Sequence, residues 1–216
     1  MADDSQKNGL VKVASTSVVR YSNALVRRGV EDAASISPEL GRLLGKRKRV
    51  LLEAAKGKTT HLLMDILGVG GFDVVDVWSS TALEQVFKEL SEHPYDAVML
   101  TIGGIETEKM LGHVSQIKSK YPDVKVVILA GDRNEDFIKQ LYSMGANIVF
   151  SWQLYRMNDD QLGITEYRMK DGQVVGGLWY VAEFVEAIQE LFPGHKHLSY
   201  PEGWEKIHEI ERDTLK

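Results

Sequence analysis

The residues best suited to chemistry in this chain form one short turn, which follows an apolar run at 50–55. The turn carries lysine, glycine and hydroxyl side chains and ends in a histidine: Lys56, Gly57, Lys58, Thr59, Thr60 and His61. If a helix begins here, its free N–H groups and its dipole favour an anion, and the lysines add positive charge. The structural alternative is that Thr59 or Thr60 caps the helix while the lysines face solvent. The turn is not a P-loop, because the first glycine of that motif would fall on Leu52.

Two further groups of small or polar residues stand at the ends of apolar runs. They are Thr101, Gly103 and Gly104, which start at the last residue of the run at 95–101, and Ala130, Gly131 and Asp132, which start at the last residue of the run at 124–130. Small residues at such places let a ligand approach the backbone closely. A carboxylate at Asp132 could meet a ligand, although we favour 132–134 as a capping sequence for the next helix. We identify no catalytic residue and no metal ligand, because the chain shows no nucleophile elbow and no histidine pair at metal-binding spacing.

The elements that must position these residues alternate along the chain. Apolar runs predict five strands, at 49–55, 72–77, 95–101, 124–130 and 147–151, and helical spacing predicts a helix after each. Alternating strands and helices with short connections predict a flavodoxin-like α/β fold, a doubly wound five-stranded parallel sheet of order 2-1-3-4-5. Ligands in such sheets bind beyond the carboxyl ends of the strands, which is where the predicted site residues lie.

The remaining segments flank this sheet. Residues 1–45 are predicted to be an N-terminal extension that is partly helical, at 16–30 and 38–44, and 46–194 to be the α/β domain. An insertion at 152–177 precedes the last helix, at 178–192, and contains a hairpin signal at 164–175 with Asp171-Gly172 in its turn. The tail, 195–216, shows helical spacing from Trp204 to Ile210 and docks either on the core or on a second subunit.

Composition narrows the class of protein. The 216 residues are 44% hydrophobic and 26% charged, which is enough to build a core, and the absence of cysteine excludes disulfides and thiolate sites. No signal pattern is found, and no apolar run approaches the roughly 20 residues of a membrane helix, so we expect a cytoplasmic protein without membrane contact. The formal net charge of −5 argues against nucleic-acid binding, despite the local basic run at 46–49.

The segment 96–152 resembles the receiver domain of response regulators, in its element order and in the Met144-Gly145-Ala146 before the last strand. Receivers need a carboxylate pair after strand one, an aspartate ending strand three, a hydroxyl after strand four and a lysine after strand five. In this chain those places hold Ala54 and Ala55, Thr101, Ala130 and Trp152. The resemblance therefore implies a receiver-like domain without phosphotransfer at this site.

The segment 71–100 is similar, without a gap, to the cobalamin-binding domain of B12-dependent mutases and methyltransferases. The small residues at 100–104 and at 130–131 match places where that family brings a corrinoid near the backbone. The family's Asp-x-His-x-x-Gly motif would fall on 54–59, where Ala54 replaces the aspartate and Lys56 replaces the cobalt-binding histidine. A protonated lysine cannot ligate cobalt, and His61 would need a register shift to do so. The resemblance implies a corrinoid or another tetrapyrrole bound without the usual histidine ligand.

Three functional hypotheses follow. The first is a non-catalytic, regulatory ligand-binding module for cobalamin, another tetrapyrrole or a phosphorylated small molecule, using the residues of the turn at 56–61 and the two small-residue groups. The second is a pseudo-receiver that signals through protein contacts, made with a partner or a second copy by the N-terminal helix, the insertion or the tail. The third is the small subunit of a cobalamin-dependent enzyme. Since no acid, base or nucleophile pair stands at the strand ends, we do not expect an enzyme that acts alone.

Overall fold

The protein was studied as a computed structural model, which describes residues 47–54, 58–77, 82–102, 107–131, 134–157, 161–194 and 202–215. The predicted N-terminal extension, with its helices at 16–30 and 38–44, lies outside this part of the chain. None of the helices in the described ranges is long and apolar enough to cross a bilayer.

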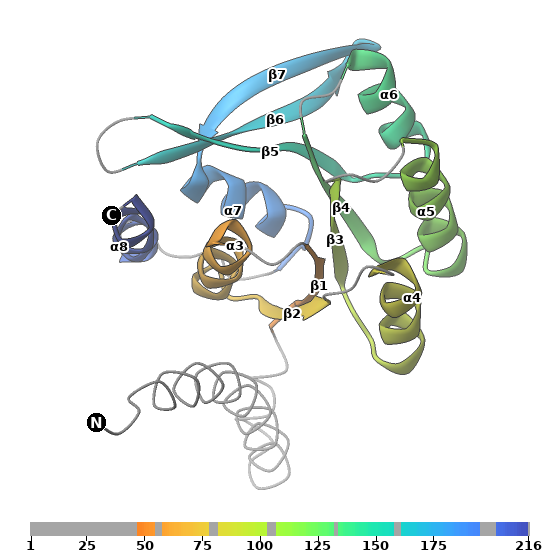
Figure 1. Ribbon diagram of the computed structural model, residues 1–216, viewed down its shortest axis with the longest axis horizontal. Helices are drawn as coiled ribbons and strands as arrows, with labels where there is room; N and C mark the ends of the chain where they lie inside the picture. The colour runs from red at the N-terminus through yellow and green to blue at the C-terminus, as the bar shows by residue number, and fades with distance from the viewer. Residues whose placement is uncertain are drawn as a thin grey trace, which may run out of the picture. The chain divides into compact units, whose positions relative to one another are not determined.

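One mixed sheet organises the described chain (Figure 1). Its strands are β1 (Arg49–Glu53), β2 (Asp73–Val77), β3 (Ala97–Ile102), β4 (Lys125–Ala130), β5 (Ile148–Arg156), β6 (Leu162–Lys170) and β7 (Gln173–Tyr180). The spatial order is β2-β1-β3-β4-β5-β6-β7, and β1 to β5 pair in parallel. The predicted flavodoxin-like order 2-1-3-4-5 is therefore confirmed, but the sheet has seven strands rather than five, because β6 and β7 continue it in antiparallel.

Helices cover both faces of this sheet. The helices are α3 (Lys58–Val69), α4 (Ala82–Glu92), α5 (Thr107–Lys120), α6 (Glu135–Ser143), α7 (Val181–Gln189) and α8 (Glu202–Leu215). Figure 1 shows α3, α7 and α8 on one side and α4, α5 and α6 on the other. Central strands such as β4, with the sequence KVVILA, are apolar at consecutive positions because each side chain meets one helical layer or the other.

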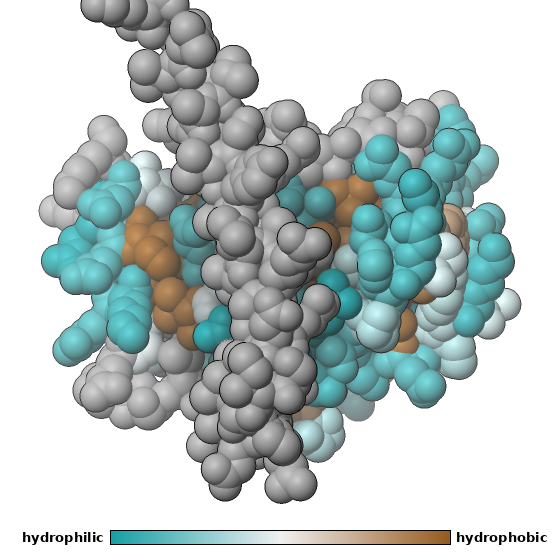
Figure 2. Space-filling view, turned by 90° about the horizontal axis from the view of Figure 1, so that it is seen from below, coloured by the Kyte–Doolittle hydropathy of each residue, from teal (hydrophilic) through white to brown (hydrophobic). Residues whose placement is uncertain are grey.

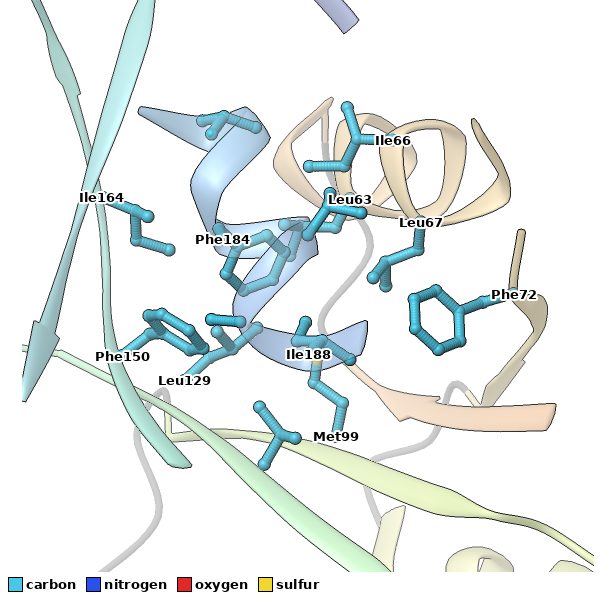
Figure 3. Packing of buried hydrophobic residues seen from close by; sticks show 14 of the residues in the cluster. Leu63, Ile66, Leu67, Phe72, Met99, Leu129, Phe150, Ile164, Phe184 and Ile188 are labelled. Carbon is cyan, nitrogen blue, oxygen red and sulfur yellow. The ribbon is translucent and has the colours of Figure 1, made fainter. Parts of the chain in front are cut away.

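The two layers enclose separate hydrophobic clusters. The cluster under α3 and α7 includes Phe150 and Phe184, whose rings meet edge to face with centroids 4.7 Å apart (Figure 3). The cluster under α4, α5 and α6 includes Val98, Ile128 and Val149. On the face seen in Figure 2, hydrophilic side chains cover much of the described surface, and hydrophobic residues are visible between them.

The hairpin departs from its predicted bounds. Its turn is correct, since Asp171 and Gly172 both have positive φ, of 51° and 76°, as a two-residue hairpin turn requires. The prediction that residues 178–180 start the last helix is wrong, because Leu178, Trp179 and Tyr180 are extended and pair with β6. The helix α7 begins only at Val181, where the Tyr180 N–H donates to the Glu183 carboxylate at 2.7 Å.

The C-terminal tail forms a helix that docks on this chain's own core. Ile207 of α8 is 1% exposed and belongs to the cluster under α3 and α7. The buried Glu211 accepts hydrogen bonds from the Leu162 N–H at 3.0 Å and contacts His208 Nδ1 at 2.7 Å. The predicted tail helix is therefore confirmed, and of the two docking modes left open the structure shows the one on the core.

Candidate site at the carboxyl ends of the parallel strands

The structure describes only part of the predicted site. Five of its residues lie outside the described ranges, namely Lys56, Gly57, Gly103, Gly104 and Asp132. Lys58 and Thr59 are the first residues of α3, and their side chains lie outside the described part. The predicted grouping of these residues around a ligand therefore remains a prediction.

The first turn of α3 differs from the capping alternative. Because the helix begins at Lys58, Thr59 and Thr60 lie within its first turn, and the prediction that one of them is the N-cap is wrong. Thr60 is buried, at 1% exposure, and it interacts with other groups of the protein. His61 lies in α3, as the sequence predicts, and its side chain is exposed. These two neighbours thus point to different environments, one to the core and one to solvent.

A buried carboxylate stands at the end of β1, where the sequence analysis placed no functional residue. Glu53 is 8% exposed, and its Oε2 accepts from the Thr101 N–H at 3.1 Å and lies 3.4 Å from Thr101 Oγ1. The β1–β3 pairing ends at Glu53 opposite Leu100, so Thr101 is the first residue of β3 beyond the end of that ladder. The Glu53 carboxylate therefore accepts the hydrogen bond of the Thr101 N–H in place of a backbone carbonyl of β1, and it satisfies this donor where the β1–β3 ladder ends.

Burial sets the protonation of this group. Desolvation raises the pKa of Glu53 above its ordinary value of 4.5, and the backbone and hydroxyl hydrogen bonds from Thr101 partly oppose that rise. Both donors favour the ionised form, whereas the surrounding apolar strands favour the neutral one. The arrangement suits a structural acceptor, and both contacts of the carboxylate oxygen come from the same threonine.

The end of β4 is buried and is followed by a helix cap. Ala130 is fully buried and pairs with Ile102 on one side and Ser151 on the other. Asn134 is the N-cap of α6, with its Oδ1 accepting from the Phe137 N–H at 2.9 Å. The predicted capping role of 132–134 is thereby confirmed for Asn134, and Gly131 is half-buried beside it.

Two of the described positions at these strand ends carry no polar side-chain group. Ala54 is 4% exposed and Ala130 is fully buried, and the methyl group of an alanine is neither a carboxylate nor a hydroxyl. Thr101 does carry a hydroxyl, and its backbone N–H and its hydroxyl both contact Glu53. Among the residues that the structure describes, no three His, Asp or Glu side chains gather where they could hold a metal ion.

An open pocket of about 390 Å³ lies elsewhere, between α6, the start of β5, β6 and the end of α7. Its lining includes Tyr142, Glu166, Arg168 and Glu190, and Arg168 pairs with the buried Glu166 at 2.7 Å. None of the predicted site residues lines it. The pocket is therefore separate from the predicted site at the carboxyl ends of the parallel strands.

Sequence reasoning missed Glu53, although the sequence carries a signal for it. The run at 50–55, VLLEAA, contains a single charged residue among apolar ones. A carboxylate in a strand buried on both faces must find donors, because burying it without them is costly. Its partner could not be read from the sequence, since the contact joins residues 48 positions apart.

Comparisons with known proteins give a likeness of fold. No protein-family model matches the sequence. No curated protein matches it either.

Several solved structures are similar to part of the chain. HP1043, an orphan response regulator of H. pylori, is 23% identical, with a TM-score of 0.43, over 50% of this chain and 85% of its own. A response regulator from Thermotoga maritima is 22% identical, with a TM-score of 0.41, over 47% of this chain and 82% of its own. A CheY-like protein, tadZ, from Pseudomonas aeruginosa is 16% identical, with a TM-score of 0.42, over 49% and 87%. These three structures are response regulators or CheY-like proteins, and the likeness is one of fold.

Proposed function

We propose that this chain is a regulatory module of the pseudo-receiver kind, which carries no phosphoryl group and acts through contacts with other protein surfaces. The observation that carries the proposal is the contact between Glu53 and Thr101 at the end of β3. It engages the residue that stands at the phosphoacceptor position, between the buried Ala54 and Ala130.

A role in protein contacts is supported by the distribution of exposed apolar side chains. Leu178 and Val175 of β7 are 53% and 47% exposed, and Tyr155 of β5 is 40% exposed. All three belong to the part of the sheet that extends beyond its parallel core. Leu178 and Tyr155 lie on the same face of the sheet, whereas Val175 lies on the other face. Exposed apolar residues that gather on one face mark interaction surfaces more often than residues scattered singly do.

The test is a thermal unfolding experiment with Mg²⁺ and beryllofluoride, which imitates a phosphoryl group when it binds an aspartate carboxylate. A ligand bound only by the folded state must raise the melting temperature, so the proposal expects no change for this protein. A receiver that has the full set of acidic residues serves as the positive control. A rise in melting temperature that the Thr101→Val variant abolishes would contradict the proposal.

Binding of cobalamin or another tetrapyrrole stays a prediction from the sequence, as does a role as the small subunit of a cobalamin-dependent enzyme. Both hypotheses place the ligand on the turn at 56–61 and on the small residues after β3 and β4. They are tested by titrating the protein with hydroxocobalamin, adenosylcobalamin and haem and following the absorption spectrum and the melting temperature.

A further inference from the structure

The β6–β7 hairpin has two faces of different chemistry. Paired residues of antiparallel strands point to the same face, and side chains alternate along each strand. Tyr167 packs in the cluster under α4, α5 and α6, whereas Ile164 packs in the cluster under α3 and α7, which fixes the two faces. The face on the α6 side, here called the neutral face, comprises Tyr155, Gly163, Thr165, Tyr167, Met169, Val174, Gly176, Leu178 and Tyr180.

The neutral face carries no charged side chain, in a chain of which 26% is charged. The opposite face of the same strands carries Glu166, Arg168 and Lys170, and Arg168 also stacks on Trp179 at 5.1 Å. Interface cores are depleted in charged residues and enriched in aromatic residues and methionine. The composition of the neutral face is therefore that of a contact surface.

Much of the neutral face is open to solvent. Leu178 is 53% exposed, Tyr155 40% and Met169 38%. Figure 1 shows α6 beside the turn end of the hairpin, and its Tyr142 donates to the carbonyl of Tyr167, the residue that pairs with Gly176. No other helix of the described chain lies over the middle of β6 and β7 on that side (Figure 1).

The outer edge of β7 is also open, since no strand of the described ranges pairs with it. In a hairpin closed by a two-residue turn, hydrogen-bonded pairs alternate from the pair that closes the turn, here Lys170 and Gln173. The backbone groups of Val174, Gly176 and Leu178 therefore point away from β6. A Cβ added at Gly176 would meet no atom closer than 3.7 Å, so the neutral face has room for a side chain at this position.

This edge lacks the features that keep edge strands apart. Natural edge strands are protected by charged residues, by proline or by a bulge, and β7, with the sequence QVVGGLWY, has none of these. It is an uncharged strand of 8 residues, and no strand of the described ranges pairs with its outer edge. Such an edge is suited to pairing with another strand.

We propose that two copies of the chain form a dimer in which their β7 strands pair in antiparallel about a two-fold axis at Gly176. This symmetry places Val174 beside the partner's Leu178 and joins the two neutral faces into one surface. Each copy carries a formal net charge of −5, so the net charges of two copies repel one another. The uncharged strand and the neutral face are the places where they meet without like charges in contact. The inference rests on the proposed function, because it names the contact surface that such a module needs.

The experiment uses the full chain, whose natural lack of cysteine allows single cysteines to be introduced cleanly. Gly176→Cys places one thiol on the axis, and residues directly opposite in antiparallel strands have Cβ atoms about 4.5–5.5 Å apart. A short bismaleimide should therefore convert this variant to a covalent dimer. Gln116→Cys, on the exposed side of α5, is the matched control and should stay monomeric on denaturing gels.

Light scattering after size exclusion tests the same interface without a crosslink. The native chain should have twice the mass of one chain, and Gly176→Lys or Leu178→Lys should raise the dimer dissociation constant by more than about tenfold. Gln116→Lys adds the same charge elsewhere and should leave the dimer intact. Unchanged circular dichroism and urea midpoints would show that each variant still folds.

A native chain that is monomeric and not crosslinked through position 176 would overturn the inference, as would a dimer that resists both lysine substitutions. If the native chain is monomeric and does not respond to beryllofluoride, the proposed function holds, but its contact surface serves another protein rather than a second copy. A response to beryllofluoride in a dimer of the expected kind would overturn the proposed function alone.

Discussion

Replacing Glu53 tests whether the buried carboxylate closes the β1–β3 ladder. Two uncharged variants of similar size separate its two effects. Glu53→Gln keeps an oxygen that accepts from the Thr101 N–H, whereas Glu53→Leu leaves that buried donor without an acceptor. Since neither variant carries a charge, the difference in their unfolding free energies isolates the hydrogen bond. Leaving a buried donor unsatisfied costs about 1–3 kcal/mol, so Glu53→Leu should be less stable than Glu53→Gln by that amount.

The native chain should differ from Glu53→Gln in its pH dependence. The pKa of Glu53 is raised in the folded protein above the ordinary 4.5 that applies when the chain is unfolded. At pH values between the pKa of Glu53 in the unfolded chain and its raised pKa in the folded protein, the folded state binds more protons than the unfolded state. The free energy of unfolding therefore falls as pH rises between these two pKa values. The glutamine variant imitates the protonated acid and should lack this part of the fall.

Urea unfolding of the three proteins at several pH values between 4 and 8, followed by circular dichroism, provides the measurement. The reasoning is refuted if Glu53→Leu is as stable as Glu53→Gln, because Thr101 would then need no acceptor. It is also refuted if the native chain and Glu53→Gln show the same pH dependence, because the carboxylate would then titrate as an exposed group does.

Other changes probe the rest of the account. Glu211→Ala removes the carboxylate of α8 that accepts from the Leu162 N–H at the start of β6. The free energy of unfolding, measured in urea, should fall by about 1–3 kcal/mol, and α8 should become more sensitive to proteases. Unchanged proteolysis would contradict this role. Gly70→Ala would place a Cβ only 2.4 Å from a methyl of Val185 and should cost about 1–3 kcal/mol, while Gly68→Ala meets no atom within 4 Å in α3 and should stabilise by up to about 1 kcal/mol. If the sequence prediction of a tetrapyrrole site holds, adding hydroxocobalamin, adenosylcobalamin or haem should change the absorption spectrum of the ligand and raise the melting temperature of the protein. Both effects should be smaller for His61→Ala. No spectral change with any of the three ligands would contradict the hypothesis.

The parallel part of the fold could be predicted because its signals are local and repeated. Each strand is a short apolar run, each helix has apolar residues at helical spacing, and the order of the elements leaves few topologies. The hairpin turn could be read from Asp171 and Gly172, which have the positive φ that such a turn needs. The end of β7 could not, because Leu178, Trp179 and Tyr180 continue the amphipathic pattern of α7 and are held in a strand only by pairing with β6.

The candidate site was less predictable, since it depends on contacts between distant residues. The sequence identified Thr101 and Ala130 at the ends of their strands, and both lie there. It did not identify Glu53, which resembles an ordinary strand residue until β3 is placed beside it. The neutral face was equally hidden, because its residues alternate with charged ones along the chain and separate only when the register of β6 and β7 is known.

The most direct test of the central claim is the intact mass of the protein after incubation with acetyl phosphate and Mg²⁺. The proposed pseudo-receiver function predicts that the mass is unchanged, because the resemblance to receivers puts Thr101 in place of the acceptor aspartate, and Thr101 contacts Glu53. A gain of one phosphoryl group, located by fragmentation at the carboxyl ends of β1, β3 or β4, would contradict the account.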